Sequence, residues 1–190
     1  MKIAIVGAAG RMGQKLCALA AGTELEVVSK VDVAEGYDKT WSKDVEGVID
    51  FSYHTAVPPS VTRAAEAGIP YVIGTTGLTE DEQKAVDAAA GKIPVVQSGN
   101  YSLGVNLLQE LVKKAATILG LEYDVEITEM HHRHKKDAPS GTALMLARAA
   151  AQGRSEESGA EQSDADFVCG RKGDIGERPV GEIAIHALRG

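Results

Sequence analysis

The sequence predicts an α/β protein with a doubly wound parallel sheet, followed by a smaller α+β domain with a mixed or antiparallel sheet. Three observations carry this prediction. Short apolar runs alternate with amphipathic helical segments through the first half of the chain. A glycine-rich turn directly follows the first apolar run. Composition and period then change near Ser102, so we expect one domain over residues 1–102 and a second over residues 103–190.

Composition and charge limit the classes of function. The chain has 190 residues, of which 44% are hydrophobic and 25% charged, as is typical of a globular protein. Aromatic residues make up only 4%, so we expect a core of Ala, Val, Ile and Leu. The net charge of −7 argues against nucleic acid as a partner, and no apolar run is long enough to cross a membrane. Cys17 and Cys169 show no disulfide or metal spacing, so we expect a reduced, cytoplasmic setting without a signal peptide.

The elements of the first domain follow from apolar runs and helix-start signals. Thr79 is a good N-cap, and Glu82 three residues later completes a capping box. Pro58 suits the first turn of a helix. Trp41 lies in a polar stretch, where we expect local packing rather than a ligand platform. We expect strands at residues 2–6, 24–31, 47–52, 69–73 and 94–97, and helices at residues 14–21, 58–67 and 79–92.

The second domain is expected to begin with a helix over residues 102–119, whose apolar residues form a core face. Residues 122–130 alternate apolar and polar, which is typical of a half-exposed antiparallel strand. Ser140 is a good N-cap for the apolar helical run at residues 143–151, and Pro139 stops that helix from extending backwards. Beyond it we expect a mobile acidic loop or insertion at residues 154–166, a strand at 167–169, a glycine-rich loop at 170–179 and a strand at 181–188.

The turn Gly7-Ala-Ala-Gly-Arg-Met-Gly13 stands between the first strand and the first helix, as in dinucleotide-binding domains. Its spacing is Gly-x-x-Gly-x-x-Gly rather than the stricter Gly-x-Gly-x-x-Gly, because Ala9 replaces the middle glycine. Glycines let the backbone approach a pyrophosphate at the helix N-terminus. Asp32, at the end of the second strand, is placed to hold the hydroxyls of a ribose. We therefore expect a Rossmann-like domain that binds a dinucleotide, rather than a plain βα turn.

The loops that follow the strands share one edge of the predicted sheet. In doubly wound sheets, ligands bind outside the carboxyl ends of the strands. Each loop alone can be explained as an ordinary turn. Their position at a common edge favours one long cofactor cleft, which Phe51 and Ser52 are also expected to line. The candidate cofactor-binding residues are Gly7, Ala8, Ala9, Gly10, Arg11, Met12, Asp32, Gly74, Thr75, Thr76, Ser98, Gly99, Asn100 and Tyr101.

The most informative stretch is Glu129-Met-His-His-Arg-His-Lys-Lys-Asp-Ala-Pro-Ser-Gly-Thr142. Its histidines, arginine and lysines fall just before a helix N-terminus, whose N–H groups and dipole also attract anions. This arrangement suits a small, multiply anionic ligand. A histidine with a nearby lysine can also donate protons at neutral pH.

Two other interpretations of this stretch stay open. A basic run before a helix is often only a solvated loop. His132 and His134 share one face of an extended segment and can bind a metal ion. No third ligand is evident in the sequence, so we expect no metal site.

Together, these motifs resemble the 4-hydroxy-tetrahydrodipicolinate reductase family, also called dihydrodipicolinate reductases. The resemblance covers residues 2–190, and its most specific part is the stretch at residues 129–143. The other matching segments, in the expected order, are residues 7–13, 50–51, 74–77, 100–106 and 176–179. The resemblance implies an NAD(P)H-dependent oxidoreductase that reduces a cyclic, dicarboxylated, imine-type intermediate to tetrahydrodipicolinate in the diaminopimelate route to lysine. It also implies a homotetramer.

The resemblance assigns roles to the candidate residues. His131 is expected to be the catalytic proton donor or acceptor, and Lys135 the second proton donor. His132, Gly141 and Thr142 are expected to bind the substrate carboxylates. Residues 1–102 then form the dinucleotide-binding domain, and residues 103–190 the substrate-binding and oligomerisation domain.

Two departures from the family pattern matter. Val33 follows Asp32 where many members carry an arginine suited to a 2′-phosphate, and Asp32 itself repels that phosphate. We therefore expect NADH to be preferred over NADPH, although Arg11 or Lys30 can reach a phosphate. The family also continues past Gly190 with further strands and a last helix, so we expect the second domain to be truncated at its C-terminus.

Two alternative functions remain. One is a dinucleotide-binding but catalytically impaired, truncated homologue. The other is a dehydrogenase of related architecture that acts on another small carboxylate, such as aspartate. The histidine and lysine cluster at residues 131–135, followed by Pro139-Ser-Gly-Thr142, favours the reductase over this dehydrogenase.

Overall fold

The structure is a computed structural model that describes residues 1–159 and 166–190. Its backbone forms two compact units, Met1–Gly99 and Asn100–Gly190, which we call the N-terminal and C-terminal units. The division lies just before Ser102, near the point where the sequence pattern changes. Each unit has its own sheet and its own apolar core.

The N-terminal unit is built on five parallel strands in the order β2-β1-β3-β4-β5. The chain starts inside the sheet at β1, passes outward to β2, and then returns to build β3, β4 and β5 on the other side. The predicted doubly wound parallel sheet is therefore confirmed, with a switch point between β1 and β3. The elements are β1 (Lys2–Val6), α1 (Arg11–Ala20), β2 (Glu26–Val31), β3 (Gly47–Asp50), η1 (His54–Ala56), α2 (Val57–Ala67), β4 (Tyr71–Ile73), α3 (Glu80–Ala90) and β5 (Val95–Gln97).

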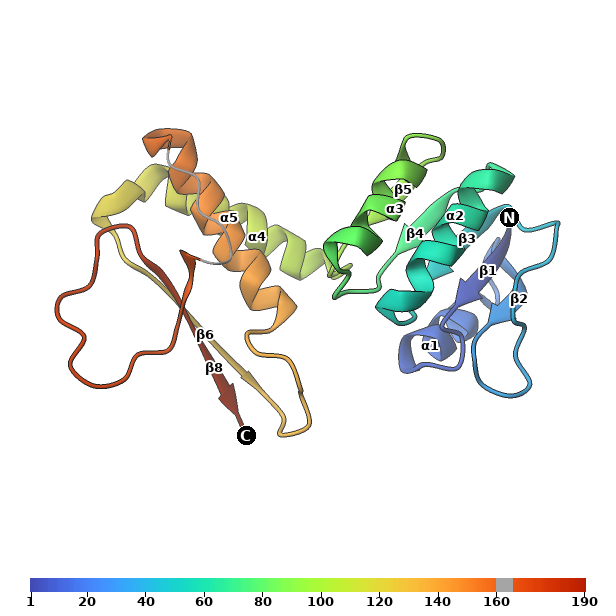
Figure 1. Cartoon of the computed structure of the whole chain (residues 1–190), viewed down its shortest axis with the longest axis horizontal. Helices are drawn as coiled ribbons and strands as arrows, with labels where there is room; N and C mark the ends of the chain where they lie inside the picture. The colour runs from blue at the N-terminus through green and yellow to red at the C-terminus, as the bar shows by residue number, and fades with distance from the viewer. Residues whose placement is uncertain (160–165) are drawn as a thin grey trace. The chain divides into compact units, whose positions relative to one another are not determined.

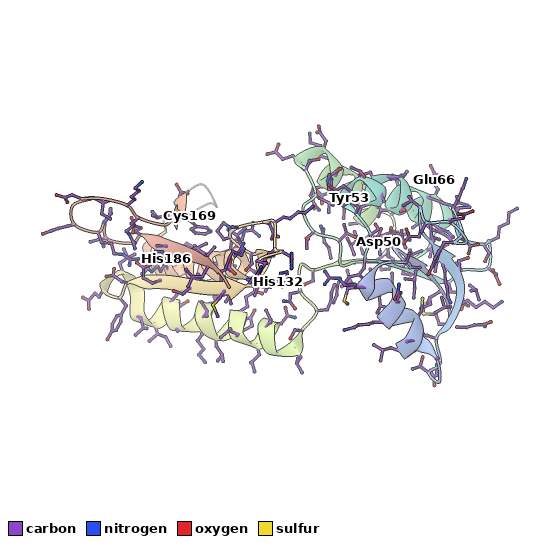
Figure 2. All side chains as sticks on the ribbon, turned by 90° about the horizontal axis from the view of Figure 1, so that it is seen from below. Asp50, Tyr53, Glu66, His132, Cys169 and His186 are labelled. Atoms are coloured by element: carbon purple, nitrogen blue, oxygen red, sulfur yellow. The ribbon has the colours of Figure 1, made fainter. Side chains whose placement is uncertain are left out.

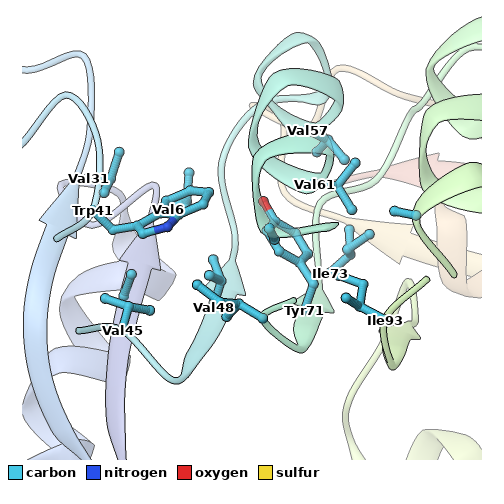
Figure 3. Packing of buried hydrophobic residues seen from close by; sticks show 14 of the residues in the cluster. Val6, Val31, Trp41, Val45, Val48, Val57, Val61, Tyr71, Ile73 and Ile93 are labelled. Carbon is cyan, nitrogen blue, oxygen red and sulfur yellow. The ribbon is translucent and has the colours of Figure 1, made fainter. Parts of the chain in front are cut away.

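Helices cover both faces of this sheet (Figure 1). Alternate residues of β1 point to opposite faces, so Ala4 and Val6 join one core and Ile3 and Ile5 the other. The first core contains the inward sides of α2 and α3, and Trp41 and Tyr71 pack within it (Figure 3). The second core is formed against α1. The predicted local packing of Trp41 is thus confirmed.

The predicted helix-start signals act as expected. The Thr79 hydroxyl accepts a hydrogen bond from the Glu82 amide, and the Glu82 carboxylate accepts one from the Thr79 amide. This capping box satisfies two backbone donors at the start of α3. The Ser102 and Ser140 hydroxyls cap the two long helices of the C-terminal unit in the same way as N-caps.

The C-terminal unit carries a three-stranded sheet in the order β6-β8-β7, with all pairs parallel. The predicted mixed or antiparallel sheet is therefore wrong for the described residues. Alternation of apolar and polar residues shows only that one face of a sheet is covered. It occurs in parallel and in antiparallel strands, so it does not predict strand direction. Parallel strands need long crossovers, which α5 and the glycine-rich loop after β7 supply. The elements are α4 (Leu103–Leu119), η2 (Gly120–Glu122), β6 (Val125–His131), α5 (Gly141–Ser158), β7 (Val168–Cys169) and β8 (Ile183–Arg189).

Helix α5 is longer than the sequence predicts. The expected loop over residues 154–166 begins instead as the last turns of this helix, and residues 160–165 lie outside the described part. Arg154 is buried and donates hydrogen bonds to the carbonyl oxygens of Tyr123 and Gly181. A charged residue in a polar stretch, where the sequence predicts a loop, is therefore buried in a helix because backbone carbonyls accept its hydrogen bonds. Burial lowers the pKa of its guanidinium.

The apolar face of α4 also differs from the prediction. Leu107, Leu111 and Ile118 are exposed, whereas Ala116 is the residue that the helix buries. Helix α4 meets α5 through small residues: a Cβ placed on Gly153 would lie 2.3 Å from the Lys113 carbonyl oxygen. The close approach of the two backbones, rather than the leucines, forms this contact.

Candidate functional site

The glycine turn after β1 is shaped for close backbone approach. Gly7 has a φ of +80°, and a Cβ on it would lie 2.4 Å from the Phe51 carbonyl oxygen. A Cβ on Gly13 would lie 2.2 Å from the Gly7 carbonyl oxygen. Gly10 is the N-cap of α1 and provides no side-chain cap, so the first N–H groups of that helix are offered to a ligand.

Asp32 closes the side of this turn. Its Oδ2 accepts a hydrogen bond of 2.8 Å from the Ala9 amide, and its Oδ1 accepts one of 2.8 Å from the Val33 amide. Each carboxylate oxygen has more than one acceptor position. The side chain therefore braces the turn and can still receive the hydroxyls of a ribose.

A cavity of about 1030 Å³ opens beside the turn. Gly7, Ala9, Gly10 and Asp32 line it among the predicted cofactor residues. Its other walls come from the loop after β2, from Phe51 to Tyr53, and from helix α2. This space is large enough for a sizeable part of a dinucleotide.

A buried carboxylate joins the loops at this edge. Asp50, at the end of β3, is fully buried, and its Oδ2 accepts a hydrogen bond of 2.6 Å from the Tyr71 hydroxyl. Its Oδ1 accepts bonds from the amide and hydroxyl of Ser52 and, at 2.9 Å, from the Thr75 hydroxyl. The Phe51 ring fills the space over Gly74, where a Cβ would lie 2.2 Å from a ring carbon. The loops after β3 and β4 are thus tied together.

The other predicted cofactor residues fall in three places. Ala8 is buried under the turn, and Arg11 and Met12 are the first exposed residues of α1. The loops that follow β4 and β5 lie at the same carboxyl edge of the sheet, although they do not line the cavity; they hold Gly74, Thr75, Thr76, Ser98 and Gly99. Asn100 and Tyr101 belong to the C-terminal unit.

His131 is the last residue of β6, and its Nδ1 is hydrogen-bonded to Oε2 of Glu129. The Glu129 carboxylate is nearly buried and also accepts a bond of 3.2 Å from the Ser140 amide. Burial acts to raise the pKa of Glu129, but the hydrogen bonds from His131 and Ser140 outweigh it and lower that pKa. Glu129 is therefore an ionised acceptor that orients the imidazole. Arg189 adds a cation 3.6 Å away.

Lys135 lies in the loop after β6, with its amide bonded to the His132 carbonyl at 3.1 Å. Its Nζ lies 2.8 Å from Oδ2 of Asp137. The hydrogen bond from Lys135 lowers the pKa of the Asp137 carboxyl. The imidazoles of His132 and His134 lie with their centroids 6.0 Å apart (Figure 2 labels His132). The loop thus gathers several basic side chains.

The helix that follows completes this cluster. Ser140 caps α5, so that Gly141 and Thr142 form its first turn. Apart from the residues next to it in sequence and the backbone of its own helix, no described residue has an atom within 4 Å of a Cβ placed on Gly141. The start of the helix is therefore open to a ligand. The Thr142 hydroxyl oxygen accepts a hydrogen bond of 3.3 Å from the Asn100 amide group and can still donate its own proton. His131, His132, Lys135, Gly141 and Thr142 therefore all come from one strand, one loop and one helix start of the C-terminal unit.

Within residues 1–159 and 166–190, no three His, Cys, Asp or Glu side chains come together as a set of metal ligands. No helix within these ranges has the length and apolar character needed to cross a membrane.

Nearly the whole chain matches two family models. The model described as dihydrodipicolinate reductase, N-terminus, matches residues 1–101, and the model described as dihydrodipicolinate reductase, C-terminus, matches residues 104–190. The chain belongs to the dihydrodipicolinate reductase family. The resemblance inferred from its motifs is confirmed.

Curated relatives of this reductase-family chain carry the name 4-hydroxy-tetrahydrodipicolinate reductase. The chain is 45% identical to that of Zymomonas mobilis subsp. mobilis, over 83% of this chain and 64% of the relative. It is 43% identical to that of Caldanaerobacter subterraneus subsp. tengcongensis, over 100% of this chain and 76% of the relative. The matched region therefore spans roughly two thirds to three quarters of these relatives.

A solved structure has the same fold. The dipicolinate-bound dihydrodipicolinate reductase from Paenisporosarcina sp. TG-14 aligns with a TM-score of 0.64 and 24% identity, over 100% of this chain and 78% of that chain. The likeness supports the α/β architecture of this family member.

Sequence reasoning did not assign roles to several residues that organise these sites in the dihydrodipicolinate reductase fold. Glu129 orients His131, and its position two residues earlier on the same strand face was a usable signal. Asp50 stood out only as part of a family motif, and its four hydrogen bonds include partners far along the chain. Arg63 lies over the Trp41 ring on the cavity wall, and no local pattern marks it.

Proposed function

We propose that this chain is an NAD(P)H-dependent reductase that converts 4-hydroxy-tetrahydrodipicolinate (dihydrodipicolinate) to tetrahydrodipicolinate in the diaminopimelate route to lysine. One observation carries the proposal. In a chain of this family, a dinucleotide-type glycine turn beside a cavity occurs together with a histidine and lysine cluster at a helix start. The first suits a nicotinamide cofactor, and the second suits an anionic substrate that must be protonated.

The N-terminal unit fits a nicotinamide dinucleotide. The close contact over Gly7 and the open start of α1 suit a pyrophosphate, and Asp32 suits a ribose diol. The bound cofactor supplies a hydride. NADH is the preferred form in this proposal, because Asp32 repels a 2′-phosphate and the neighbouring Val33 offers no positive charge.

The C-terminal unit supplies the proton and holds the substrate. An ionised Glu129 accepts a hydrogen bond from Nδ1–H of His131, so that Nε2 is the nitrogen that faces the proton exchange with the substrate. Lys135, positioned by Asp137, is the second proton donor. 4-Hydroxy-tetrahydrodipicolinate loses its hydroxyl as water to give dihydrodipicolinate, which accepts one hydride and one proton. The reduced product keeps both carboxylates.

Two carboxylates of the substrate need hydrogen-bond donors. His132 and the N–H groups of Gly141 and Thr142 at the start of α5 supply them in this proposal, because a helix N-terminus favours negative charge. Dipicolinate, the ligand named for the Paenisporosarcina reductase, is itself a dicarboxylate. We also propose a homotetramer, an expectation that rests on the family and that light scattering of the purified chain will test.

The test is NADH oxidation by the purified 190-residue chain, with substrate generated in place from pyruvate and aspartate semialdehyde by the preceding synthase. Turnover that depends on the synthase supports the reductase. NADH binding without turnover would point instead to a dinucleotide-binding protein. Turnover of aspartate with NAD⁺ would assign the chain to a different dehydrogenase class.

A further inference from the structure

One cation in the N-terminal unit has no role in the function proposed above. The Arg63 guanidinium, on helix α2, lies over the ring of Trp41 at 5.1 Å from its centroid. Trp41 is only 6% exposed and packs in the core, so its ring is a fixed platform. A guanidinium held against an aromatic face keeps its plane and its charge while losing freedom of rotation.

This pair lies on the wall of the cavity. Trp41 and Arg63 line the same space as Gly7, Gly10 and Asp32. A dinucleotide whose pyrophosphate meets the glycine turn and whose ribose meets Asp32 has its adenine beyond Asp32. The walls left to receive it are the loop after β2 and helix α2, which carry Trp41 and Arg63.

The surroundings favour a flat, neutral ring over a second phosphate. Val33, Ala34, Ala56 and Pro59 give this part of the cavity an apolar lining. Two carboxylates, Asp32 and Glu35, line it together with the cations Lys39 and Arg63, so the lining has no excess of positive charge to attract a second phosphate. The planar guanidinium presents a face on which a nucleobase can stack.

We propose that Arg63, held against the Trp41 ring, is the residue that stacks on the adenine of the cofactor and sets affinity for the adenosine half. The inference rests on the proposed binding of a nicotinamide dinucleotide, and it adds a specificity-determining residue to that site. It applies equally to NADH and NADPH, because the adenine is common to both.

Binding of fragments tests the proposal apart from turnover. ADP-ribose carries the adenine, and nicotinamide mononucleotide carries the other half. Trp41 is the single tryptophan of the chain, so its fluorescence reports on the part of the cavity wall beside Arg63. ADP-ribose is expected to change Trp41 emission in the wild-type chain, and nicotinamide mononucleotide is not. An equal response to both fragments would contradict the placement of the adenine.

Variants at Arg63 then separate stacking from charge. Calorimetric titration of Arg63→Ala with ADP-ribose is expected to give a Kd about five- to tenfold above wild type. Arg63→Lys is expected to give a similar loss, because it keeps the charge and loses the plane. Lys84→Ala removes an exposed cation of the same unit away from the cavity, and its Kd should match wild type.

A comparison of 5′-AMP with adenosine 2′,5′-bisphosphate completes the test. Arg63→Ala should weaken both by the same factor. A loss confined to the bisphosphate, with rescue by Arg63→Lys, would show that Arg63 reads a phosphate and overturn the stacking role. An unchanged Kd for ADP-ribose in Arg63→Ala would refute any role, while failure of the wild-type chain to bind ADP-ribose would refute the dinucleotide site itself.

Discussion

The Tyr71 hydroxyl donates a hydrogen bond of 2.6 Å to the Asp50 carboxylate, and neither side chain is more than 1% exposed. Burial, followed by the charge of Asp50, raises the pKa of Tyr71 well above its ordinary value, so the phenol remains a donor throughout the physiological range. Through Asp50 this bond links β4 to the Ser52 and Thr75 loops at the cofactor edge. A buried charge is tolerated here because it accepts several hydrogen bonds at once.

Tyr71→Phe tests the weight of this bond. The variant leaves Oδ2 of the buried Asp50 carboxylate without the Tyr71 donor, so the free energy of unfolding should fall by about 1.5–3 kcal/mol. Urea denaturation followed by circular dichroism measures it. Tyr53→Phe is the control, because Tyr53 is exposed and should change stability by less than about 0.5 kcal/mol. Equal stability of the two variants would mean that the Asp50 network is not a stabilising element.

His131→Ala and Lys135→Ala test the proton-transfer roles. Loss of a positioned acid or base should lower kcat by about 10²–10⁴-fold. The Kd for NADH should stay near the wild-type value, because neither residue is among the proposed cofactor-binding residues. His186→Ala is the matched control, since His186 lies on the neighbouring strand and pairs with Glu126. An unchanged kcat in either variant would remove that residue from catalysis.

Glu129→Gln tests the orientation of His131 through its pH dependence. The folded-state pKa of Glu129 is lowered from its ordinary value of 4.5, so its ionised form contributes stability that is fully present above pH 4.5. The variant should be less stable than wild type at neutral pH, by about 1–3 kcal/mol. As the pH falls from 4.5 through the folded pKa, wild type loses this advantage and the difference should close. Urea midpoints at neutral and acid pH measure it, and a gap that widens in acid would contradict the assignment.

Local signals predicted much of the fold because they act over a few residues. The capping box of Thr79 and Glu82, the Ser102 and Ser140 caps and the glycine turn each depend on neighbours in sequence. The order of apolar runs and helices also predicted the parallel sheet of the N-terminal unit. The cationic cluster around His131 was visible because one strand, one loop and one helix start carry it.

Features set by distant contacts were not predictable in this way. The strand direction of the second sheet depends on crossovers rather than on alternation along a strand. Arg154 can be buried because the carbonyl oxygens of Tyr123 and Gly181 accept its hydrogen bonds. Asp50 can be buried because the hydroxyls of Tyr71 and Thr75 donate hydrogen bonds to it. These hydrogen-bond partners lie far away in sequence, so a local sequence pattern does not reveal them.

Val33→Arg tests the cofactor preference. The Val33 side chain is fully exposed on the cavity wall, so an arginine fits there without a clash. Its charge should attract a 2′-phosphate and raise kcat/KM for NADPH by about tenfold, with little change for NADH. The ratio of the two kcat/KM values measures the effect. Wild-type values that are already comparable for the two cofactors would contradict the predicted NADH preference, and Val33→Gln controls for side-chain size.

Gly153→Ala tests the contact between α4 and α5. A methyl group at this position would lie 2.3 Å from the Lys113 carbonyl oxygen and 3.0 Å from the Ala116 side chain, so the helices must move apart. The free energy of unfolding should fall by about 1–3 kcal/mol. Gly104→Ala is the control on α4, because its nearest neighbour is the Ser102 hydroxyl at 3.9 Å. That variant should gain about 0.5–1 kcal/mol, since alanine restricts the unfolded chain and favours a helix. Opposite signs in urea denaturation would show that backbone proximity, and not helix propensity, sets the requirement for glycine at residue 153.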